Sequence, residues 1–362
     1  MKKNFKIIII SVLAVVLAAV IGVSAFFVTD MTGGKSGADI KIEIKKGTYA
    51  SQIAEILGDE GIISSPLGFR IFSKIKGYES QFKYGHYEFN TGDSYEEIAK
   101  KLMTQGEKAP TIPVTIPEGT GINDFVKNVD GKQVTVLGIA SILEKAGVCT
   151  KADFIAALNE YALETKLLSG AKNKVTYYAL EGYLFPETYE FYKLEDSKAA
   201  AKLVVEKMVK ETESRITDDM YTKAEQMGYT MHEILTMASI IQMEAGVDTN
   251  SLPKIAGVFY NRLKSPNFTT LGSSPTIFYG DSFEQDDDRY DTYKIKGLPP
   301  GPLCSPGIKA IKAALNPEGS DYFYFVTDKN GKFYFHKTYA EQNATIANLK
   351  QNGNWIYEYY NK

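Results

Sequence analysis

Hydrophobic and polar residues alternate with different periods along the chain, and each period predicts a different element. The first pattern is an uncharged apolar run from Ile7 to Val28. At ~1.5 Å per residue this run is ~33 Å long, which is enough to cross the hydrocarbon core of a bilayer. Lys2, Lys3 and Lys6 precede it, so the positive-inside rule predicts a cytoplasmic N-terminus and an extracytoplasmic body. Residues 1–29 are therefore predicted to form a single-pass anchor in the cell membrane.

A cleavable signal peptide is the alternative interpretation of this run, because Val23-Ser24-Ala25 resembles a small-residue cleavage site. The run is longer than the apolar region of a usual signal peptide and continues past that site, which favours a retained anchor. Both interpretations place the rest of the chain outside the cytoplasm.

After a linker at residues 30–40, alternation with period two and then helical spacing predict two strand–helix units. The stretch "IKIEIKKGT" alternates as a strand does, and helical spacing of apolar residues begins at Ile53. The second unit repeats this order, with a turn between its strand and a helix begun by Asp93 or Ser94. Residues 41–110 are therefore predicted to form a small βα module.

The helix and glycine of the first unit have an echo later in the chain. The stretch "IAEILGDEGIISSPLGF", from Ile53 to Phe69, resembles "IASILEKAGVCTKADF", from Ile139 to Phe154. Each follows a strand that ends in a Gly turn. A common helix-stop pattern would look similar, but the shared features favour a repeated βα unit in the connecting region at 111–172.

From residue 173 to 352 aromatic and acidic residues become dense, and several helices and a C-terminal hairpin are predicted. One of these helices contains "ASIIQMEAG" and closes a small and apolar run with Glu244. At ~100° per residue, Glu244 projects between Ile240 and Ile241, within the buried stripe. A buried carboxylate is costly unless it is paired or protonated, so this glutamate is a candidate for chemistry.

Composition and charge exclude several function classes. The net charge is −3 and the pI is about 5.8, which argue against a nucleic-acid partner. The three histidines have no ligand spacing, and the sequence has no Gly-rich phosphate loop after a strand, so no metal and no cofactor is predicted. Cys149 and Cys304 are far apart in the sequence and are predicted to be free or buried thiols.

Seven stretches of the chain occur in an order that resembles one known family. They are "LEGYLFPETY", "ASIIQMEAG", "IAGVFYNRL", "PTIFYG", "YDTY", "GLPPGPLCSPG" and "YFYFV". In this order they resemble the endolytic murein transglycosylases of the MltG (YceG-like) family, over residues 41–350. The resemblance implies an α+β fold with a transmembrane helix, a small LysM-like module at 41–110 and a mixed catalytic domain at 173–352 whose glutamate lies on a buried helix.

The family's reaction implies the substrate and the partners of this chain. It cleaves nascent peptidoglycan glycan strands between MurNAc and GlcNAc, consumes no water and leaves a 1,6-anhydro-MurNAc end. An enzyme of this kind would terminate glycan elongation at the membrane, beside cell-wall synthases (penicillin-binding proteins).

Glu244 matches the position of the family's catalytic glutamate. An apolar site raises the pKa of a carboxyl group towards neutral pH, as a general acid requires. Glu244 would protonate the departing glycosidic oxygen and then accept the proton of the MurNAc 6-hydroxyl. The alternative is a structural glutamate that forms an ion pair, for example with Arg262.

The remaining site candidates are residues that would line the cleft, orient Glu244, bind the sugar or stack against it. They are Glu181, Tyr183, Glu187, Asn261, Arg262, Thr276, Tyr279, Asp291 and Tyr293.

The chain departs from the family pattern where the family has polar or charged residues. The departures are Ser274, Asp291, Phe333, Gln342 and Gln242. They keep open a second function, a glycan-binding scaffold that has lost turnover and recruits synthases. A third hypothesis is a hydrolase that pairs Glu244 with a second acid such as Glu181 or Asp291.

Overall fold

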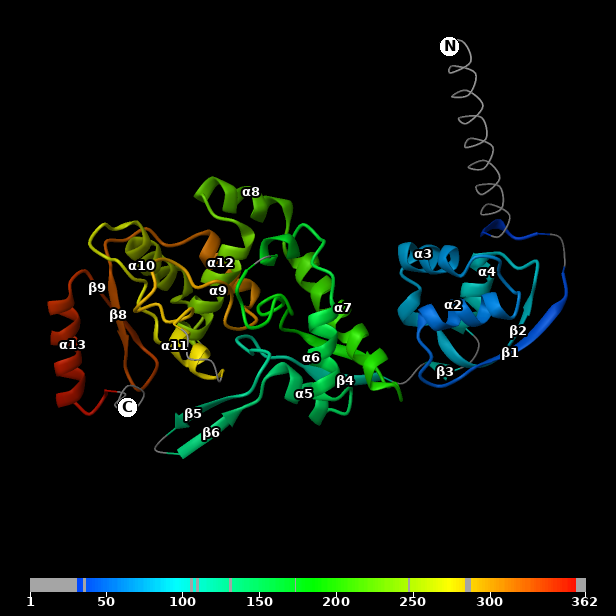
Figure 1. The fold of residues 1–362 in the computed structure, drawn as a ribbon, viewed down its shortest axis with the longest axis horizontal. Coiled ribbons are helices and arrows are strands. Elements are labelled where there is room, and N and C mark those ends of the chain that lie inside the picture. The colour runs from blue at the N-terminus through cyan, green and yellow to red at the C-terminus, as the bar shows by residue number, and fades with distance from the viewer. Residues whose placement is uncertain are drawn as a thin grey trace, which may run out of the picture. The chain divides into compact units, whose positions relative to one another are not determined.

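The computed structural model describes residues 31–34, 37–104, 107–108, 111–129, 132–172, 174–246, 248–283 and 288–355. They form two compact units, which contain both helices and strands (Figure 1). Unit 1 contains the described residues up to Thr111 together with Tyr192–Glu195, and unit 2 contains Ile112–Phe191 and the described residues from Asp196 onwards. The predicted α+β class is confirmed.

The predicted anchor lies outside the described residues. Within the part of the chain that the structure does describe, no helix is both long enough and apolar enough to cross a membrane. Membrane attachment therefore stays a prediction from the sequence.

Unit 1 is a small antiparallel sheet with helices packed on it. Strand β1 (Asp39–Ile44) pairs with β2 (Lys83–Asn90), and β3 (Glu107–Lys108) pairs with the start of β2. Helices α2 (Ala50–Asp59) and α3 (Pro66–Lys76) and the short 3-10 turn η1 (Glu79–Gln81) connect β1 to β2, and α4 (Tyr95–Thr104) follows β2. The order β–α–α–β–α agrees with the strands and helices that the sequence predicts, with α3 added.

Unit 1 has a hydrophobic core of its own. Ile42 and Ile44 of β1 lie on one face of the strand because alternate side chains point to the same side. They share the core with Leu57 of α2, Phe69 of α3 and Leu102 of α4. Both long strands, β1 and β2, and all three α-helices of unit 1 thus contribute to one cluster.

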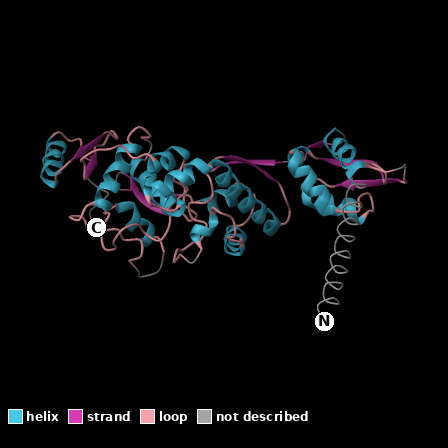
Figure 2. Ribbon diagram, turned by 90° about the horizontal axis from the view of Figure 1, so that it is seen from above, coloured by secondary structure: helices cyan, strands magenta, loops and turns pink. Residues whose placement is uncertain are grey.

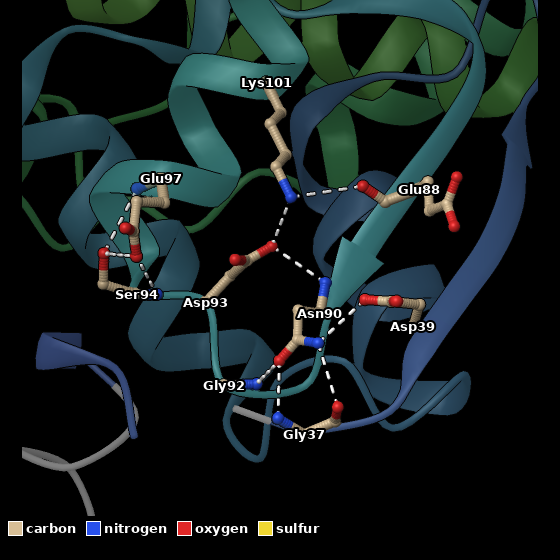
Figure 3. Close-up of polar contacts among 9 residues, drawn as sticks. All are labelled: Gly37, Asp39, Glu88, Asn90, Gly92, Asp93, Ser94, Glu97 and Lys101. Carbon is tan, nitrogen blue, oxygen red and sulfur yellow. Dashed lines mark hydrogen bonds and ion pairs between the residues drawn. The ribbon is translucent and has the colours of Figure 1, made fainter. Parts of the chain in front are cut away.

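The turn between β2 and α4 is held by a dense set of hydrogen bonds, drawn in Figure 3. The Asn90 side chain accepts from the Gly37 N–H at 2.7 Å and donates to the Gly37 carbonyl at 3.0 Å. Asp93 accepts from the Asn90 N–H at 2.9 Å and from Lys101 at 2.7 Å. Ser94, one of the two predicted start residues, caps α4. Its hydroxyl accepts from the Glu97 N–H, and its own N–H donates to the Glu97 carboxylate.

Unit 2 is mainly helical, with short paired strands, as the secondary-structure colours of Figure 2 show. The strand pairs are β4 (Thr111–Thr115) with β7 (Thr188–Tyr192), β5 (Phe125–Val129) with β6 (Lys132–Val136), and β8 (Tyr324–Thr327) with β9 (Phe333–His336). The last pair is the predicted C-terminal hairpin, with antiparallel register from Tyr324↔His336 to Thr327↔Phe333.

The helices of unit 2 fall into an early and a late group. The early group is α5 (Ile139–Lys145), α6 (Lys151–Glu160), the 3-10 turn η2 (Leu168–Ala171), α7 (Ser197–Arg215) and α8 (Asp218–Met227). The late group is α9 (Met231–Ala245), α10 (Leu252–Lys264), α11 (Ser274–Asp281), α12 (Ile308–Leu315) and α13 (Tyr339–Gln351). Helix α9 packs against α10, α11 and α12 (Figure 1), so it lies inside the late group.

The echo seen in the sequence corresponds to a repeated helix–Gly–helix arrangement. Helix α2 ends before Gly61 and α5 ends before Gly147, and both glycines have positive φ, 71° and 75°. A second helix follows in each case, α3 and α6, each with a hydroxyl side chain at its N-cap. The aromatic residue that ends the echo, Phe69 or Phe154, is buried in both. A helix pair, preceded by a strand, is thus the unit that recurs.

The two cysteines behave as the sequence predicts. Cys149 and Cys304 are both free and buried. Burial raises the pKa of both thiols above the ordinary value, so neither is poised as a nucleophile.

Candidate functional site

Glu244 lies in the last turn of α9, a helix with strong signals at both ends. The Thr230 hydroxyl accepts from the Glu233 N–H, and the Glu233 carboxylate accepts from the Thr230 N–H at 2.8 Å. Together these two bonds form a capping box. The helix ends at Gly246, whose φ is 57°. Most side chains between these ends are buried, so the neighbours of α9 fix where Glu244 lies.

The Glu244 residue is half-buried, but its carboxyl group is largely removed from water. Oε1 accepts a hydrogen bond of 2.6 Å from Oγ of Ser273. Desolvation raises the pKa of Glu244 above its ordinary value, and this effect outweighs the lowering by Ser273 and by the charge of Arg262. The carboxyl group therefore keeps its proton to a higher pH than an exposed glutamate does.

Ser273 is itself fixed by a buried network of threonines. Its N–H donates to Oγ1 of Thr292 at 2.9 Å, and its carbonyl accepts from Oγ1 of Thr276 at 2.6 Å. The two threonine hydroxyls are 2.8 Å apart, and the Gly272 N–H donates to the Thr292 carbonyl at 2.9 Å. Since Ser273, Thr276 and Thr292 are all fully buried, this network holds the Ser273 hydroxyl against Glu244.

Arg262 positions the same segment from α10. Its Nη1 donates to the carbonyls of Leu271 at 2.8 Å and Gly272 at 3.0 Å, and its Nε donates to the Phe323 carbonyl at 2.7 Å. Among the described residues, Glu244 and Arg262 do not form a salt bridge with each other. The geometry therefore does not support the alternative of a structural ion pair. The guanidinium charge still lowers the pKa of Glu244.

Asn261, the neighbour of Arg262, has a similar bracing role. Its Nδ2 donates to the carbonyls of Ser320 at 2.8 Å and Tyr322 at 2.9 Å. These bonds tie α10 to the segment that leads into β8. Asn261 and Arg262 thus contact main-chain carbonyls, and through Arg262 they support the backbone beside Ser273.

Glu181 is a second buried carboxyl group, with 1% of its surface exposed. It accepts from the Ile122 N–H at 3.2 Å and from the Tyr279 hydroxyl at 3.1 Å. Burial raises the pKa of Glu181 to about 8, although these hydrogen bonds act in the opposite direction. Tyr279 lies on α11 and Ser273 immediately precedes α11, so this short helix region contacts both carboxyl groups.

Tyr293 offers an exposed aromatic face beside the Ser273 segment. It is 51% exposed, its hydroxyl lies 3.2 Å from Oγ of Ser274, and its ring packs next to Gly272. Asp291 accepts from the Tyr293 N–H at 2.9 Å and pairs with Lys294 at 3.5 Å. Asp291 therefore shapes the turn that presents Tyr293, and Tyr293 has the surface that a sugar ring could stack on.

Two other sequence candidates, Tyr183 and Glu187, have their contacts away from the Glu244 carboxyl, whereas a third, Thr276, does not. Tyr183 is fully buried, and its hydroxyl lies 2.6 Å from Nδ1 of His232 at the start of α9. Glu187 is exposed and pairs with Arg215 of α7 at 3.0 Å. Thr276 is buried within the Ser273 network. The structure thus groups Arg262, Thr276, Asp291 and Tyr293 around the segment next to Glu244, and separates Tyr183 and Glu187 from it by their partners.

The Pro-Gly-rich segment at 298–307 lies along one face of α9. Nε2 of His232 contacts the Pro300 carbonyl at 2.7 Å, Ser239 accepts from the Leu303 N–H at 3.0 Å, and Gln242 accepts from the Gly307 N–H at 3.1 Å. A carbonyl can only accept, so Nε2 carries the proton and Nδ1 accepts from Tyr183. Burial lowers the pKa of His232, which agrees with this neutral ring.

The sequence analysis did not single out Ser273, Thr292 or His232 as functional residues. Ser273 lies two residues before the stretch "PTIFYG", and Thr292 lies inside "YDTY", so both lie in or beside stretches that carry the family resemblance. Their role depends on which segments of the folded chain lie next to each other, and this cannot be predicted from the spacing of residues in the sequence.

The chain is similar to known proteins over most of its length. The sequence pattern of the YceG-like family matches residues 42–348. A Bacillus subtilis protein named endolytic murein transglycosylase is 32% identical over 85% of this chain and 84% of its own length. A Streptococcus pneumoniae protein of the same name is 29% identical over 85% of this chain and 58% of its own length. A crystal structure of a YceG-like protein from Listeria monocytogenes covers 86% of this chain and 100% of its own, with a TM-score of 0.51 and 29% identity.

Proposed function

The chain belongs to the YceG-like family, and from this premise we propose that it is a lytic transglycosylase that cuts peptidoglycan glycan strands internally. The finer proposal is that it cleaves between MurNAc and GlcNAc in nascent strands, leaves 1,6-anhydro-MurNAc ends and so terminates elongation. The observation that carries the catalytic assignment is the desolvated Glu244 carboxyl group, held at 2.6 Å by Ser273.

One carboxyl group is enough for this reaction. Glu244, protonated at the start, gives its proton to the glycosidic oxygen as the bond from that oxygen to C1 of MurNAc breaks. The resulting carboxylate then accepts the proton of the MurNAc 6-hydroxyl as O6 bonds to C1, which closes the anhydro ring. Because the Ser273 hydroxyl donates to Oε1, Oε2 is the oxygen that exchanges the proton.

The hydrolase hypothesis needs a second carboxylate that can reach water or the sugar. Glu181 is almost completely buried and engages internal donors with both oxygens, and Asp291 is engaged in its own turn and with Lys294. These contacts disfavour both residues as the partner of Glu244.

The scaffold hypothesis rests on the departures from the family pattern. Two of them keep a polar function, because Ser274 contacts the Tyr293 hydroxyl and Gln242 still offers an acceptor to Gly307. This favours an active enzyme over a scaffold that has lost turnover.

Membrane attachment and glycan binding by unit 1 complete the proposal. The uncharged run from Ile7 to Val28 would anchor the chain with its body outside the cytoplasm. The βααβ order of unit 1 is consistent with the proposed LysM-like module, which would bind glycan near cell-wall synthases.

Product analysis tests the proposed reaction. Full-length protein in detergent would be incubated with purified sacculi, and the released muropeptides would be identified by mass spectrometry. We expect internal fragments with 1,6-anhydro-MurNAc ends. Reducing MurNAc ends would support the hydrolase instead, and binding to sacculi without any products would support the scaffold.

A further inference from the structure

Helix α3 carries an apolar stripe on its outer face. Leu67, Ile71 and Ile75 are 63%, 47% and 79% exposed, and their spacing of four residues places them on one side of the helix. Among the described residues, no other helix or strand has more than one exposed large apolar side chain. A contiguous apolar stripe of this kind marks an interaction surface more often than isolated exposed residues do.

The core of unit 1 does not require these three side chains. The opposite face of α3 packs inward through Phe69 and Phe72, whose rings lie 5.4 Å and 5.8 Å from the ring of Tyr95. Phe69 is fully buried in the cluster described above. The outer stripe therefore has some other use than stabilising unit 1.

The same helix is basic. Arg70, Lys74 and Lys76 are exposed, and the eleven residues of α3 include no acid. Arg70 and Lys74 project on the exposed side at one edge of the apolar stripe, because they are three and seven residues after Leu67. An apolar stripe bordered by cations fits a surface that is apolar beneath and anionic at its edge, as a lipid bilayer with anionic headgroups is.

The chain enters unit 1 at the turn before α4, the helix that packs against α3. The Gly34 N–H donates to the Gly92 carbonyl at 3.0 Å, and Gly37 is held by Asn90 in the network of Figure 3. Just after this turn, Tyr95 contacts α3, since its hydroxyl donates to the Ser65 carbonyl at 3.1 Å. The entry point is thus fixed at the start of α4, whose Tyr95 reaches the residue that caps α3.

The distance from the entry point to the predicted anchor is short. Gly34 is six positions after Val28, so a fully extended chain between them would span at most ~22 Å. An anchor that ends at Val28 therefore keeps the entry point, and with it the small unit that contains α3, close to the bilayer surface.

We propose that α3 docks on the membrane surface, with Leu67, Ile71 and Ile75 in the headgroup region and its basic residues on anionic headgroups. This proposal rests on the proposed membrane anchor and is independent of the transglycosylase reaction. Docking would hold unit 1 in one orientation on the bilayer from which nascent glycan is extended.

Depth-dependent quenching of a fluorescent label tests the docking. The full-length Ile71→Cys protein would carry a nitrobenzoxadiazole label and be reconstituted into phosphatidylcholine–phosphatidylglycerol vesicles that contain doxyl-labelled lipid. The native thiols are buried and do not compete for the label. Glu43→Cys, on the exposed side of β1, is the matched control, because Figure 1 shows β1 on the side of unit 1 away from α3.

We expect blue-shifted and quenched fluorescence at position 71 and neither change at position 43. Arg70→Glu in the Ile71→Cys background, or vesicles of phosphatidylcholine alone, should reduce the quenching. An unquenched label at position 71, in protein that stays with the vesicles after a carbonate wash, would overturn the docking and leave the anchor standing. Release of the protein into the carbonate supernatant would overturn both.

A competing occupant of the stripe would be a glycan strand. Soluble glycan fragments added to the vesicles should leave the quenching at position 71 unchanged. If the fragments abolish it, the stripe binds glycan and the membrane proposal is wrong. Failure of the transglycosylase proposal would instead appear only in the muropeptide products.

Discussion

At the scale of single residues, the protonation of Glu244 depends on opposing influences. Burial raises its pKa, whereas the Ser273 hydrogen bond and the Arg262 charge lower it. Arg262 also holds the backbone next to Ser273, so one side chain affects the carboxyl group in two ways. The sequence identified Glu244 from its place in an apolar helix, but Ser273 lies on a distant loop and became visible only in the fold.

Glu244→Gln keeps the shape of the side chain but cannot transfer a proton. General acid–base groups typically contribute ~10²–10⁴-fold to the rate, and the loss of turnover should lie at or above the top of that range because one residue serves both transfers. The melting temperature should rise or stay constant, because a neutral amide replaces a desolvated acid. Muropeptide release and thermal unfolding are the two measurements. Early melting with normal product release would contradict the assignment.

Ser273→Ala removes the donor at Oε1 of Glu244. The pKa of Glu244 should rise further, so the alkaline limb of the pH–rate profile should move to higher pH. The turnover should fall by about tenfold, which corresponds to a hydrogen bond of ~1.4 kcal/mol. Ser274→Ala, which removes only the contact with Tyr293, is the control and should leave the position of the limb unchanged. Identical profiles for the two variants would show that Ser273 does not act on Glu244.

Glu181 should make the stability of the fold depend on pH. Its pKa in the folded protein is about 8, against an ordinary value of 4.5, so the unfolded chain loses the proton first as the pH rises. Stability should therefore fall between about pH 4.5 and 8, by on the order of a few kcal/mol. Glu181→Gln cannot titrate at this position. Its urea midpoint should therefore be higher than that of the wild type at pH 8.5 but not at pH 5. A difference in urea midpoint that is the same at both pH values would contradict this prediction.

At the scale of elements, the predictions from periodicity were confirmed where local signals were strong. The capped helix α9, the Pro-opened helix α10 and the β8–β9 hairpin all have such signals. The hairpin β5–β6 and the helix α11 were missed because they are short and tertiary pairing decides their structure. Helix α8 was also missed, although Thr217 at its N-cap and Gly228 at its C-cap are local signals of a helix. Phe333, one of the departures, packs against Phe325 and Phe335 and so belongs to the hairpin.

The face of α9 that contacts the 298–307 segment provides a test at this scale. Gln242→Ala removes the acceptor of the buried Gly307 N–H, and an unsatisfied buried donor costs about 1–3 kcal/mol. Chemical denaturation should show a loss of stability of that size. Gln242→Glu keeps an oxygen acceptor and should lose less stability than the alanine variant. If alanine is tolerated as well as glutamate, the hydrogen bond does not hold the segment.

At the scale of the whole molecule, the separate core of unit 1 allows a deletion experiment. Removing residues 41–108 takes away the proposed glycan-binding module. Helix α9, which contains Glu244, keeps its contacts with α10, α11 and α12. Activity on polymeric sacculi should fall more than activity on short glycan fragments. Equal losses on both substrates would mean that the module serves folding only. The sequence predicted this module from its alternating strands, but nothing in its pattern indicated that a later segment joins it.

That later segment is Tyr192–Glu195, and it affects the order in which the protein can be made. Tyr192 donates to the Glu79 carbonyl at 3.4 Å, so a part of unit 1 comes from beyond the whole of Ile112–Phe191. A chain synthesised N-terminus first presents its first 111 residues well before these four. Unit 1 can then be completed only after the whole of Ile112–Phe191, the first part of unit 2, has emerged.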